Sequence, residues 1–328
     1  MTASLFSVSG KTAIVTGAGS GINLAFARLL LSRGCNVVFA DLSLRPEAKD
    51  LVAEHAILNK GQVPRAIWIE TDVTSWPALE RMFEAALAQF GDFDIVCPGA
   101  GIYEPPFSNF WYPPGSASSR DDVDGGRYAL LDINVTHPIR ATQMALSYWL
   151  HPRRALQEDG PGQAIPSNAL PANPKRIIHV SSIAAQDPGL ITPMYVASKH
   201  AISGFVRSLA PLEADFGVRV NAVAPGVVQT PLWTENPEKL KLLDLSTDVW
   251  VTAEEVAEAM LRCVEDEELV GGTVLEVGAG RTRQVHAFND PGPSQAPGMT
   301  TRNKKAIARE EVASCLGNEK LWGAWRKM

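Results

Sequence analysis

A serine, a tyrosine and a lysine in the second half of the chain could together carry out acid–base chemistry. Residues 195–199 read Tyr-Val-Ala-Ser-Lys, and Ser182 lies thirteen positions before Tyr195. Tyr195 and Lys199 are four apart, so on a helix they would share one face, one turn from each other. An ammonium favours the phenolate, so we expect Lys199 to lower the pKa of Tyr195 from about 10 toward neutrality. Because so short a motif also occurs by chance as a surface pair, its interpretation depends on the rest of the chain.

The composition is typical of a soluble globular protein. The chain has 328 residues, a net charge of −6, 45% hydrophobic residues and 20% charged residues. This mild acidity gives no reason to expect nucleic acid or an anionic membrane as a partner. No Cys/His cluster has zinc spacing, so no metal is expected. The N-terminus lacks an apolar signal core and no apolar run reaches transmembrane length, so we expect a cytoplasmic protein. Four well-separated cysteines are expected to be reduced thiols: Cys35, Cys97, Cys263 and Cys315.

Short apolar runs alternate with helical patterns along most of the chain. Continuous Val/Ile/Ala runs are typical of strands buried on both faces. Their alternation with helices predicts an α/β fold: a single Rossmann-fold domain, with a doubly wound, seven-stranded parallel sheet and helices on both faces. The expected strands are Thr12–Thr16, Asn36–Ala40, Ala66–Glu70, Phe93–Cys97, Arg176–Ser181, Arg219–Ala224 and Thr273–Val277.

We expect one domain over residues 1–283 and a C-terminal tail over 284–328. Proline- and glycine-rich stretches at about 103–126 and 151–175 are interpreted as insertions within that domain. Residues 231–251 are expected to form a substrate lid. Trp322 and Trp325 indicate that the tail packs on something, such as a neighbouring subunit, and the alternative is a partly disordered tail.

A glycine-rich turn follows the first expected strand and precedes a helical run. Gly17, Gly19 and Gly21 would let a pyrophosphate approach the helix N-terminus. Asp41 ends the second strand, where its carboxylate can accept hydrogen bonds from both ribose hydroxyls and would repel a 2′-phosphate.

The neighbours of Asp41 also favour NAD over NADP. Ser20 and Leu42, where a compensating base would stand, are uncharged, and we expect the nearby Arg45 to point away. Asp72 could hold the adenine amino group with Val73 packed on the ring, although Asp72 could instead be a turn cap.

These features together resemble the classical short-chain dehydrogenase/reductase family over about residues 8–280, and 195–208 resembles its 15-hydroxyprostaglandin dehydrogenase-like branch. Six motifs carry the resemblance: Thr-Gly-x-x-x-Gly-Ile ending at Ile22, Ala100-Gly101 after the fourth strand, Asn134, Ser182, Tyr195 with Lys199, and Pro225-Gly226 with Thr230.

The resemblance implies a role for each of these residues. Tyr195 would transfer the proton, Lys199 would lower its pKa and hold the nicotinamide ribose, and Ser182 would stabilise the substrate oxygen. The main-chain carbonyl of Asn134 would hold a water next to Lys199. Further cofactor contacts would come from Gly99, Ala100, Gly101, Pro225, Gly226, Val228 and Thr230.

Pro138 bears on the proposed role of Asn134. On a helix, the carbonyl of residue 134 would accept from the N–H of residue 138, which proline lacks. The sequence therefore frees the carbonyl that the relay needs, and the alternative is a tolerated helix kink.

Two positions depart from the family pattern. Asn23 stands where the family has glycine, and Pro98-Gly99 stands where it has Asn-Asn. We expect the Asn23 side chain to replace part of the missing bonds beside the fourth strand.

The substrate pocket is expected to be hydrophobic. It would be lined by Ile102, the 103–112 segment, Ile183, Ala184, Pro188, Thr192 and the 231–251 lid, where Leu232, Trp233, Leu240, Leu242, Leu243 and Trp250 are apolar. These residues favour a hydrophobic secondary alcohol or ketone, although they could equally pack the lid itself.

The sequence therefore predicts an NAD-dependent alcohol dehydrogenase/reductase that acts on a small hydrophobic substrate. The alternatives are a ketoreductase or epimerase of a polycyclic or aromatic metabolite, a redox-neutral cyclase or lyase on the same fold, and a cofactor-binding sensor without turnover. The resemblance also implies a homodimer or homotetramer. An apolar stripe on 201–212 could serve that interface, or it could face the sheet.

Overall fold

One eight-stranded sheet organises the computed structural model, which describes residues 6–56, 64–151, 173–187, 189–240, 244, 249–287, 313 and 317. The strand order is β3-β2-β1-β4-β5-β6-β7-β8, and all neighbours are parallel except β7 and β8. The strands are β1 (Thr12–Thr16), β2 (Asn36–Asp41), β3 (Ala66–Glu70), β4 (Ile95–Cys97), β5 (Lys175–Val180), β6 (Val218–Pro225), β7 (Val274–Gly278) and β8 (Arg281–Gln284).

The seven predicted parallel strands are confirmed, and the eighth strand was missed. β8 reads Arg-Thr-Arg-Gln, and all four residues are exposed. It pairs antiparallel with β7 at the edge of the sheet, where a strand needs no apolar run. The pattern of buried residues therefore could not reveal it.

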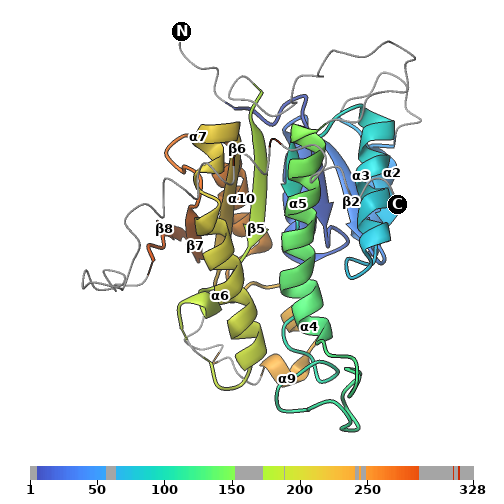
Figure 1. Ribbon diagram of the computed structural model, residues 1–328, viewed down its shortest axis with the longest axis vertical. Helices are drawn as coiled ribbons and strands as arrows, with labels where there is room; N and C mark the ends of the chain where they lie inside the picture. The colour runs from blue at the N-terminus through green and yellow to red at the C-terminus, as the bar shows by residue number, and fades with distance from the viewer. Residues whose placement is uncertain are drawn as a thin grey trace.

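Helices cover both faces of the sheet, as a doubly wound fold requires (Figure 1). α1 and α10 pack against each other on one face, whereas α3, α5 and α6 supply the core of the other. The helices are α1 (Gly21–Ser32), α2 (Pro46–Glu54), α3 (Trp76–Phe90), α4 (Ala129–Leu131), the π-helical turn η1 (Asp132–Thr136), α5 (His137–Leu150), the 3-10 turn η2 (Ile183–Ala185), α6 (Pro193–Ser208), α7 (Leu212–Phe216), α8 (Pro231–Thr234), α9 (Pro237–Leu240) and α10 (Ala253–Glu265).

α3 shows how the local sequence sets these elements. The Ser75 hydroxyl accepts from the N–H of Ala78, and proline occupies the first turn. Apolar residues at helical spacing, including Met82 and Phe83, are buried against the sheet. Gly91, with φ of 82°, ends the helix.

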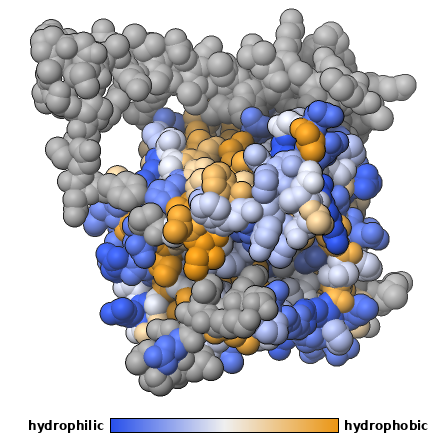
Figure 2. All heavy atoms as spheres, turned by 90° about the horizontal axis from the view of Figure 1, so that it is seen from below, coloured by the Kyte–Doolittle hydropathy of each residue, from blue (hydrophilic) through white to orange (hydrophobic). Residues whose placement is uncertain are grey.

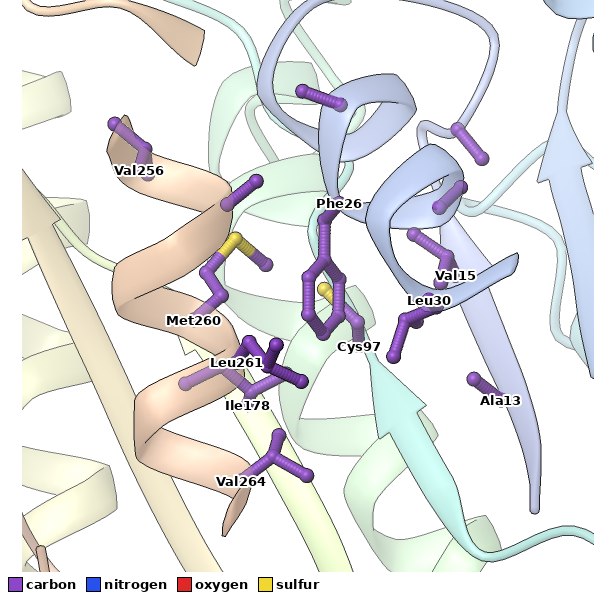
Figure 3. Close-up of a cluster of buried hydrophobic side chains, with 14 of the residues drawn as sticks. Ala13, Val15, Phe26, Leu30, Cys97, Ile178, Val256, Met260, Leu261 and Val264 are labelled. Carbon is purple, nitrogen blue, oxygen red and sulfur yellow. The ribbon is translucent and has the colours of Figure 1, made fainter. Parts of the chain in front are cut away.

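The core on the α1/α10 face is built around one aromatic ring. Phe26 of α1 is fully buried and points toward Met260 and Leu261 of α10 (Figure 3). Cys97 of β4 lies in the same cluster as a free thiol. Cys35 and Cys263 are also buried and free, and Cys315 lies outside the described residues. This packing fixes α1, and thus the glycine-rich turn before it, against the sheet.

The 201–212 stripe is used mainly inside the protein. Ile202 and Leu212 are buried in the core on the α6 face, and Phe205 is half-buried. Of the two readings of this stripe, the contacts support the one in which it faces the sheet.

The first insertion is held against α4 by polar contacts. Ser108 is fully buried, and its hydroxyl accepts from the N–H of Leu130 at 3.0 Å. The Asp121 carboxylate accepts from the N–H of Ala129 at 2.8 Å. Most of the second insertion, and Trp322 and Trp325 of the tail, lie outside the described residues.

Among the described residues, no helix is both long and apolar enough to cross a membrane. The same part of the chain contains no group of three His, Cys, Asp or Glu side chains arranged to hold a metal.

Candidate active site

The main cleft lies at the carboxyl ends of the strands, where the order reverses between β1 and β4. This is where α/β sheets of this kind bind their ligands. The cleft has a volume of about 350 Å³. Seen from the end that carries α4 and α9, hydrophobic side chains gather among hydrophilic ones (Figure 2).

The cleft brings together nearly all of the predicted site residues. Those lining it are Gly17, Ser20, Gly21, Ile22, Asp41, Leu42, Asp72, Val73, Gly99, Ala100, Gly101, Ser182, Tyr195, Lys199, Pro225, Gly226, Val228 and Thr230. Gly19 and Asn134 are not among the lining residues. The expected pocket residues Ile102, Leu232 and Trp233 line it too. The other expected residues that the structure describes do not line it: the 103–112 segment, Ile183, Ala184, Thr192, Leu240 and Trp250. Pro188, Leu242 and Leu243 lie outside the described residues. Sequence reasoning missed Asn23, Thr71, Ile133, Val180 and Ser181 as lining residues.

The glycine-rich turn is shaped by close approach of the backbone. Gly17 has φ of 71°, and a Cβ there would lie 2.8 Å from Ala100 Cα. A Cβ at Gly19 would lie 2.3 Å from the carbonyl oxygen of Ser43. The Gly19 N–H donates to Asp41 Oδ2 at 2.8 Å. These two positions accept only glycine without movement of the neighbouring chain.

Arg45 does not reach toward Asp41 as a free cation. Its guanidinium donates to both carboxylate oxygens of Glu235, at 2.7 and 2.5 Å. Glu235 follows α8, at the start of the expected lid, so this ion pair joins the lid to the segment after β2. The prediction that Arg45 is turned away from the cofactor site agrees with this contact.

Asp72 has a local structural role. Its Oδ1 accepts from the N–H and the hydroxyl of Thr74, at 2.9 and 2.8 Å. The turn-cap alternative is therefore present in the structure. Because Asp72 also lines the cleft beside Val73, both roles are compatible.

Tyr195 and Lys199 lie one turn apart in the first half of α6 and line the cleft, where Lys199 is buried and Tyr195 is half-buried. Lys199 Nζ is 5.3 Å from the centre of the Tyr195 ring and donates to the Val180 carbonyl at 2.8 Å. Ser182, two residues after β5, lies within hydrogen-bonding reach of the Tyr195 side chain and lowers the pKa of that phenol. Its hydroxyl also accepts from the Ala184 N–H at 3.2 Å. A hydroxyl, a phenol and an ammonium thus meet at one point.

Burial changes the proton affinities of this group. It raises the pKa of Tyr195 to about 12, although the hydrogen bond with Ser182 acts in the opposite direction. Burial also lowers the pKa of Lys199 to about 8. The expectation that Tyr195 has a lowered pKa is wrong for the protein by itself, because the cost of removing a phenolate from water exceeds the effect of its neighbours.

Asn134 lies behind the cleft wall, next to Lys199. A Cβ at Gly101 would be 3.4 Å from Asn134 Oδ1 and 3.8 Å from Lys199 Nζ. The Asn134 side chain pairs with the main chain of Ile102, accepting from its N–H at 2.9 Å and donating to its carbonyl at 2.8 Å.

The helix around Asn134 is π-helical over Asp132–Thr136. The His137 N–H donates to the Asp132 carbonyl, five residues back. Pro138 has no N–H to offer the Asn134 carbonyl, so this local widening accompanies the proline, as expected for a π-bulge near a functional site. The relay role of that carbonyl stays a prediction.

Asn23 occupies the space that Gly99 leaves. It is 9% exposed, and a Cβ at Gly99 would lie 2.3 Å from Asn23 Oδ1. A Cβ at Gly17 would lie 2.9 Å from Asn23 Nδ2. The two departures from the family pattern therefore face each other, and the side chain points inward beside β4 as predicted.

Aromatic rings cluster around Tyr195 and Trp233, which both line the cleft. Tyr103 lies edge-on to Tyr195 with ring centres 4.7 Å apart, and its ring is 5.4 Å from that of Trp233 in α8. Trp250 lies 6.4 Å from Trp233. Trp233 and Trp250 thus pack on one another, and Trp233 also lines the cleft.

The sequence profile of the short chain dehydrogenases matches residues 11–159 and 167–241. A cis-4-hydroxycyclohexanecarboxylate dehydrogenase of Sinomonas cyclohexanicum is 32% identical, over 83% of this chain and 96% of its own. The 15-hydroxyprostaglandin dehydrogenase [NAD(+)] of Rattus norvegicus is 28% identical, over 88% of this chain and 99% of its own.

Solved structures of similar proteins share the fold. A 3-ketoacyl-(acyl-carrier-protein) reductase from Brucella melitensis, complexed with NADH, superposes with a TM-score of 0.64 at 23% identity. The superposition covers 84% of this chain and 99% of the reductase chain. A short chain dehydrogenase from Burkholderia cenocepacia, in complex with NADP, gives a TM-score of 0.62 at 24% identity, over 83% and 98% of the two chains.

Proposed function

The chain belongs to the short-chain dehydrogenase/reductase family, and from this premise we propose that it interconverts a hydrophobic secondary alcohol and its ketone with NAD. Its family makes it an oxidoreductase acting on alcohols or ketones, with a fold that binds a nicotinamide cofactor. The observation that carries the finer proposal is the meeting of Ser182, Tyr195 and Lys199 at one point of the cleft.

Each of these three side chains has a separate role in proton transfer. When bound, the nicotinamide exchanges a hydride with the substrate carbon. Ser182 and Tyr195 hydrogen-bond the substrate oxygen, and Tyr195 accepts its proton during oxidation or returns it during reduction. Lys199, whose pKa of about 8 lies near neutrality, favours the phenolate when it is protonated. The Asn134 carbonyl would connect this lysine to solvent through a water.

A second candidate function is ketone reduction as the main reaction, and the raised pKa of Tyr195 favours it. With a pKa of about 12, the phenol keeps its proton at neutral pH and is ready to act as an acid toward a ketone. Oxidation requires the cationic environment of a loaded site to lower that pKa. We therefore expect ketone reduction to tolerate lower pH than alcohol oxidation does.

The residues around Asp41 support NAD as the cofactor. Its carboxylate is fixed by the Gly19 N–H and lies where a ribose would pass. Leu42 beside it is uncharged and 63% exposed. Arg45, a cation close to this position in the sequence, is held by Glu235. A 2′-phosphate would thus meet a carboxylate without a free cation from Arg45 to offset it.

The lining of the cleft supports a hydrophobic substrate. Ile102, Leu232 and Trp233 are apolar lining residues of the cleft. Among the described lining residues the charged side chains are Asp41, Asp72 and Lys199, and the two carboxylates belong to the nucleotide side. A substrate would therefore be bound mainly by apolar and aromatic contact.

A panel of secondary alcohols and ketones tests this function directly. Each substrate is supplied with NAD or NADP, in oxidised or reduced form, and the absorbance of the reduced nicotinamide is followed. We expect turnover with apolar, cyclic or aromatic substrates, and a preference for NAD. Product formation without any change in nicotinamide absorbance would favour a redox-neutral lyase instead.

A further inference from the structure

Glu104 is a buried carboxylate in an unusual backbone conformation. It is 5% exposed and has φ of 31°, and among the described residues no other non-glycine residue has a positive φ. Such a conformation is unfavourable for a residue with a side chain, so the surrounding contacts must hold it in place.

The contacts of Glu104 connect two distant segments. Its Oε2 accepts from the main-chain N–H of Tyr195 at 2.8 Å. Its Oε1 accepts from the N–H of Phe110 at 3.0 Å, and its carbonyl accepts from Asn109 Nδ2 at 2.9 Å. One carboxylate therefore joins the 104–110 loop to the residue expected to transfer the proton.

Its position also suits the start of α6. Tyr195 is the third residue of this helix, and the preceding Thr192 makes no side-chain cap. The first N–H groups of a helix lack partners within the helix, and a negative charge there is favoured by the helix dipole. Glu104 supplies that charge from 91 positions earlier in the chain.

A second contact fastens the same loop to the segment before α6. Trp111 Nε1 donates to the Leu190 carbonyl at 2.9 Å. Tyr103, next to Glu104, places its ring 4.7 Å from the ring of Tyr195. Movement of Glu104 would therefore displace both the phenol and the aromatic wall beside it.

We propose that Glu104 is a positioning residue, whose carboxylate fixes the N-terminus of α6 and thereby the place of Tyr195 relative to the substrate side of the cleft. This inference rests on the proposed function of Tyr195. The carboxylate acts through two acceptor oxygens that each receive one N–H. A glutamine offers one oxygen and one N–H₂, so it can keep only one of these bonds.

The experiment compares Glu104→Gln with Glu255→Gln in the full chain. Glu255 is a matched control, because its carboxylate also joins two main-chain N–H groups, those of Thr252 and Gly280, at the start of α10 and outside the cleft. Glu104→Asp keeps the charge with a shorter reach and should be intermediate.

The first measurement is hydrogen–deuterium exchange, which needs no substrate. Glu104→Gln should speed exchange in the 193–198 peptide about tenfold while α3 peptides are unchanged, since α3 does not depend on this contact. Glu255→Gln should speed exchange only at the start of α10. Unchanged exchange at 193–198 in Glu104→Gln would overturn the proposal, even if the protein proved to have another activity.

The second measurement is turnover with the best substrate of the panel. Glu104→Gln should lower kcat about tenfold to a hundredfold, because small misplacement of a reacting group is costly. It should also shift the pH profile of kcat and leave the Kd for NAD within about twofold, whereas Glu255→Gln should change none of these. Faster exchange at 193–198 with unchanged kcat and pH profile would overturn the positioning role.

Absence of turnover in the wild type would instead count against the proposed function, and the exchange result would still decide the structural part of the inference.

Discussion

The proposed cofactor side and the proposed substrate side of the cleft place their functional groups by different means. From β1 to β4, glycines and main-chain groups set the shape, as where the Gly19 N–H meets Asp41 and Gly17 approaches Ala100. Around α6, side chains reach across long stretches of sequence, as Glu104 does to Tyr195. The Arg45–Glu235 ion pair joins the two sides across an even longer stretch. The first side depends on small residues in a local motif, and the second on contacts between distant segments.

This difference predicts which properties a substitution on each side should change. A change on the cofactor side should disturb packing and nucleotide binding together, because backbone is directly displaced. A change on the substrate side should affect turnover while leaving the nucleotide site intact.

Tyr195→Phe should give the largest functional effect and the cleanest separation of the two sides. Removing the phenol oxygen should lower kcat at least about a thousandfold, within the range for loss of a general acid or base. NAD binding, followed by fluorescence titration, should change less than about twofold. A variant that keeps more than a tenth of the wild-type kcat would contradict the role given to Tyr195.

Lys199→Met should remove activity and stabilise the fold. Burial lowers the pKa of Lys199 from 10.5 to about 8. Between these values the unfolded chain binds more protons at this side chain, so the free energy of unfolding rises with pH through that window. Below about pH 8 the buried charge costs the wild type up to about 3 kcal/mol.

Urea unfolding at pH 7 and pH 10 checks this expectation. The variant should be more stable than the wild type at pH 7, and the difference should shrink at pH 10. An unchanged difference between the two pH values would show that the charge of Lys199 has no such cost.

Gly99→Ala and Asn23→Gly form a test of the cofactor side. Alone, Gly99→Ala should cost about 1–3 kcal/mol of stability, because its Cβ would meet the Asn23 amide at 2.3 Å. In the Asn23→Gly background the same change should cost less than about 0.5 kcal/mol. The double-mutant cycle therefore measures the coupling of these positions. Gly204→Ala is a control, since a Cβ at Gly204 meets nothing within 4 Å.

Additive effects of Asn23→Gly and Gly99→Ala would mean that the two residues do not share one space.

The smallest expected effect concerns the ion pair that links the two sides. Glu235→Gln should release Arg45 and raise kcat/KM with NADP about fivefold relative to NAD, because an exposed ion pair contributes up to about 1 kcal/mol. In an Arg45→Ala background the same substitution should leave the cofactor ratio unchanged. A gain in NADP use without Arg45 would assign the effect to Glu235 itself.

The same difference explains what the sequence could and could not reveal. The seven parallel strands and the cleft residues Gly17, Gly21, Asp41 and Asp72 follow from local patterns of burial, glycine and strand ends. β8 was missed because an exposed edge strand needs no apolar run. Glu104 and the Arg45–Glu235 pair depend on segments 91 and 190 positions apart, which local periodicity does not bring together.

The raised pKa of Tyr195 also could not be predicted from the spacing of residues in the sequence. A lysine four residues away correctly predicted the shared helix face. The dominant influence was instead burial by Tyr195's surroundings, which depends on how α6, β5 and the 103–112 loop pack. Spacing along a helix predicts which side chains are neighbours, whereas the extent to which a side chain is removed from water is known only from the complete fold.

The most direct test of the central claim is the fate of the hydrogen on the substrate carbon. The wild-type protein is given NAD and a secondary alcohol deuterated at the carbinol carbon, and the reduced cofactor is analysed by mass spectrometry. The account predicts one deuterium in NADH for each ketone formed. Ketone formed with unlabelled NADH, or product formed without NADH, would contradict hydride transfer at the Tyr195 site.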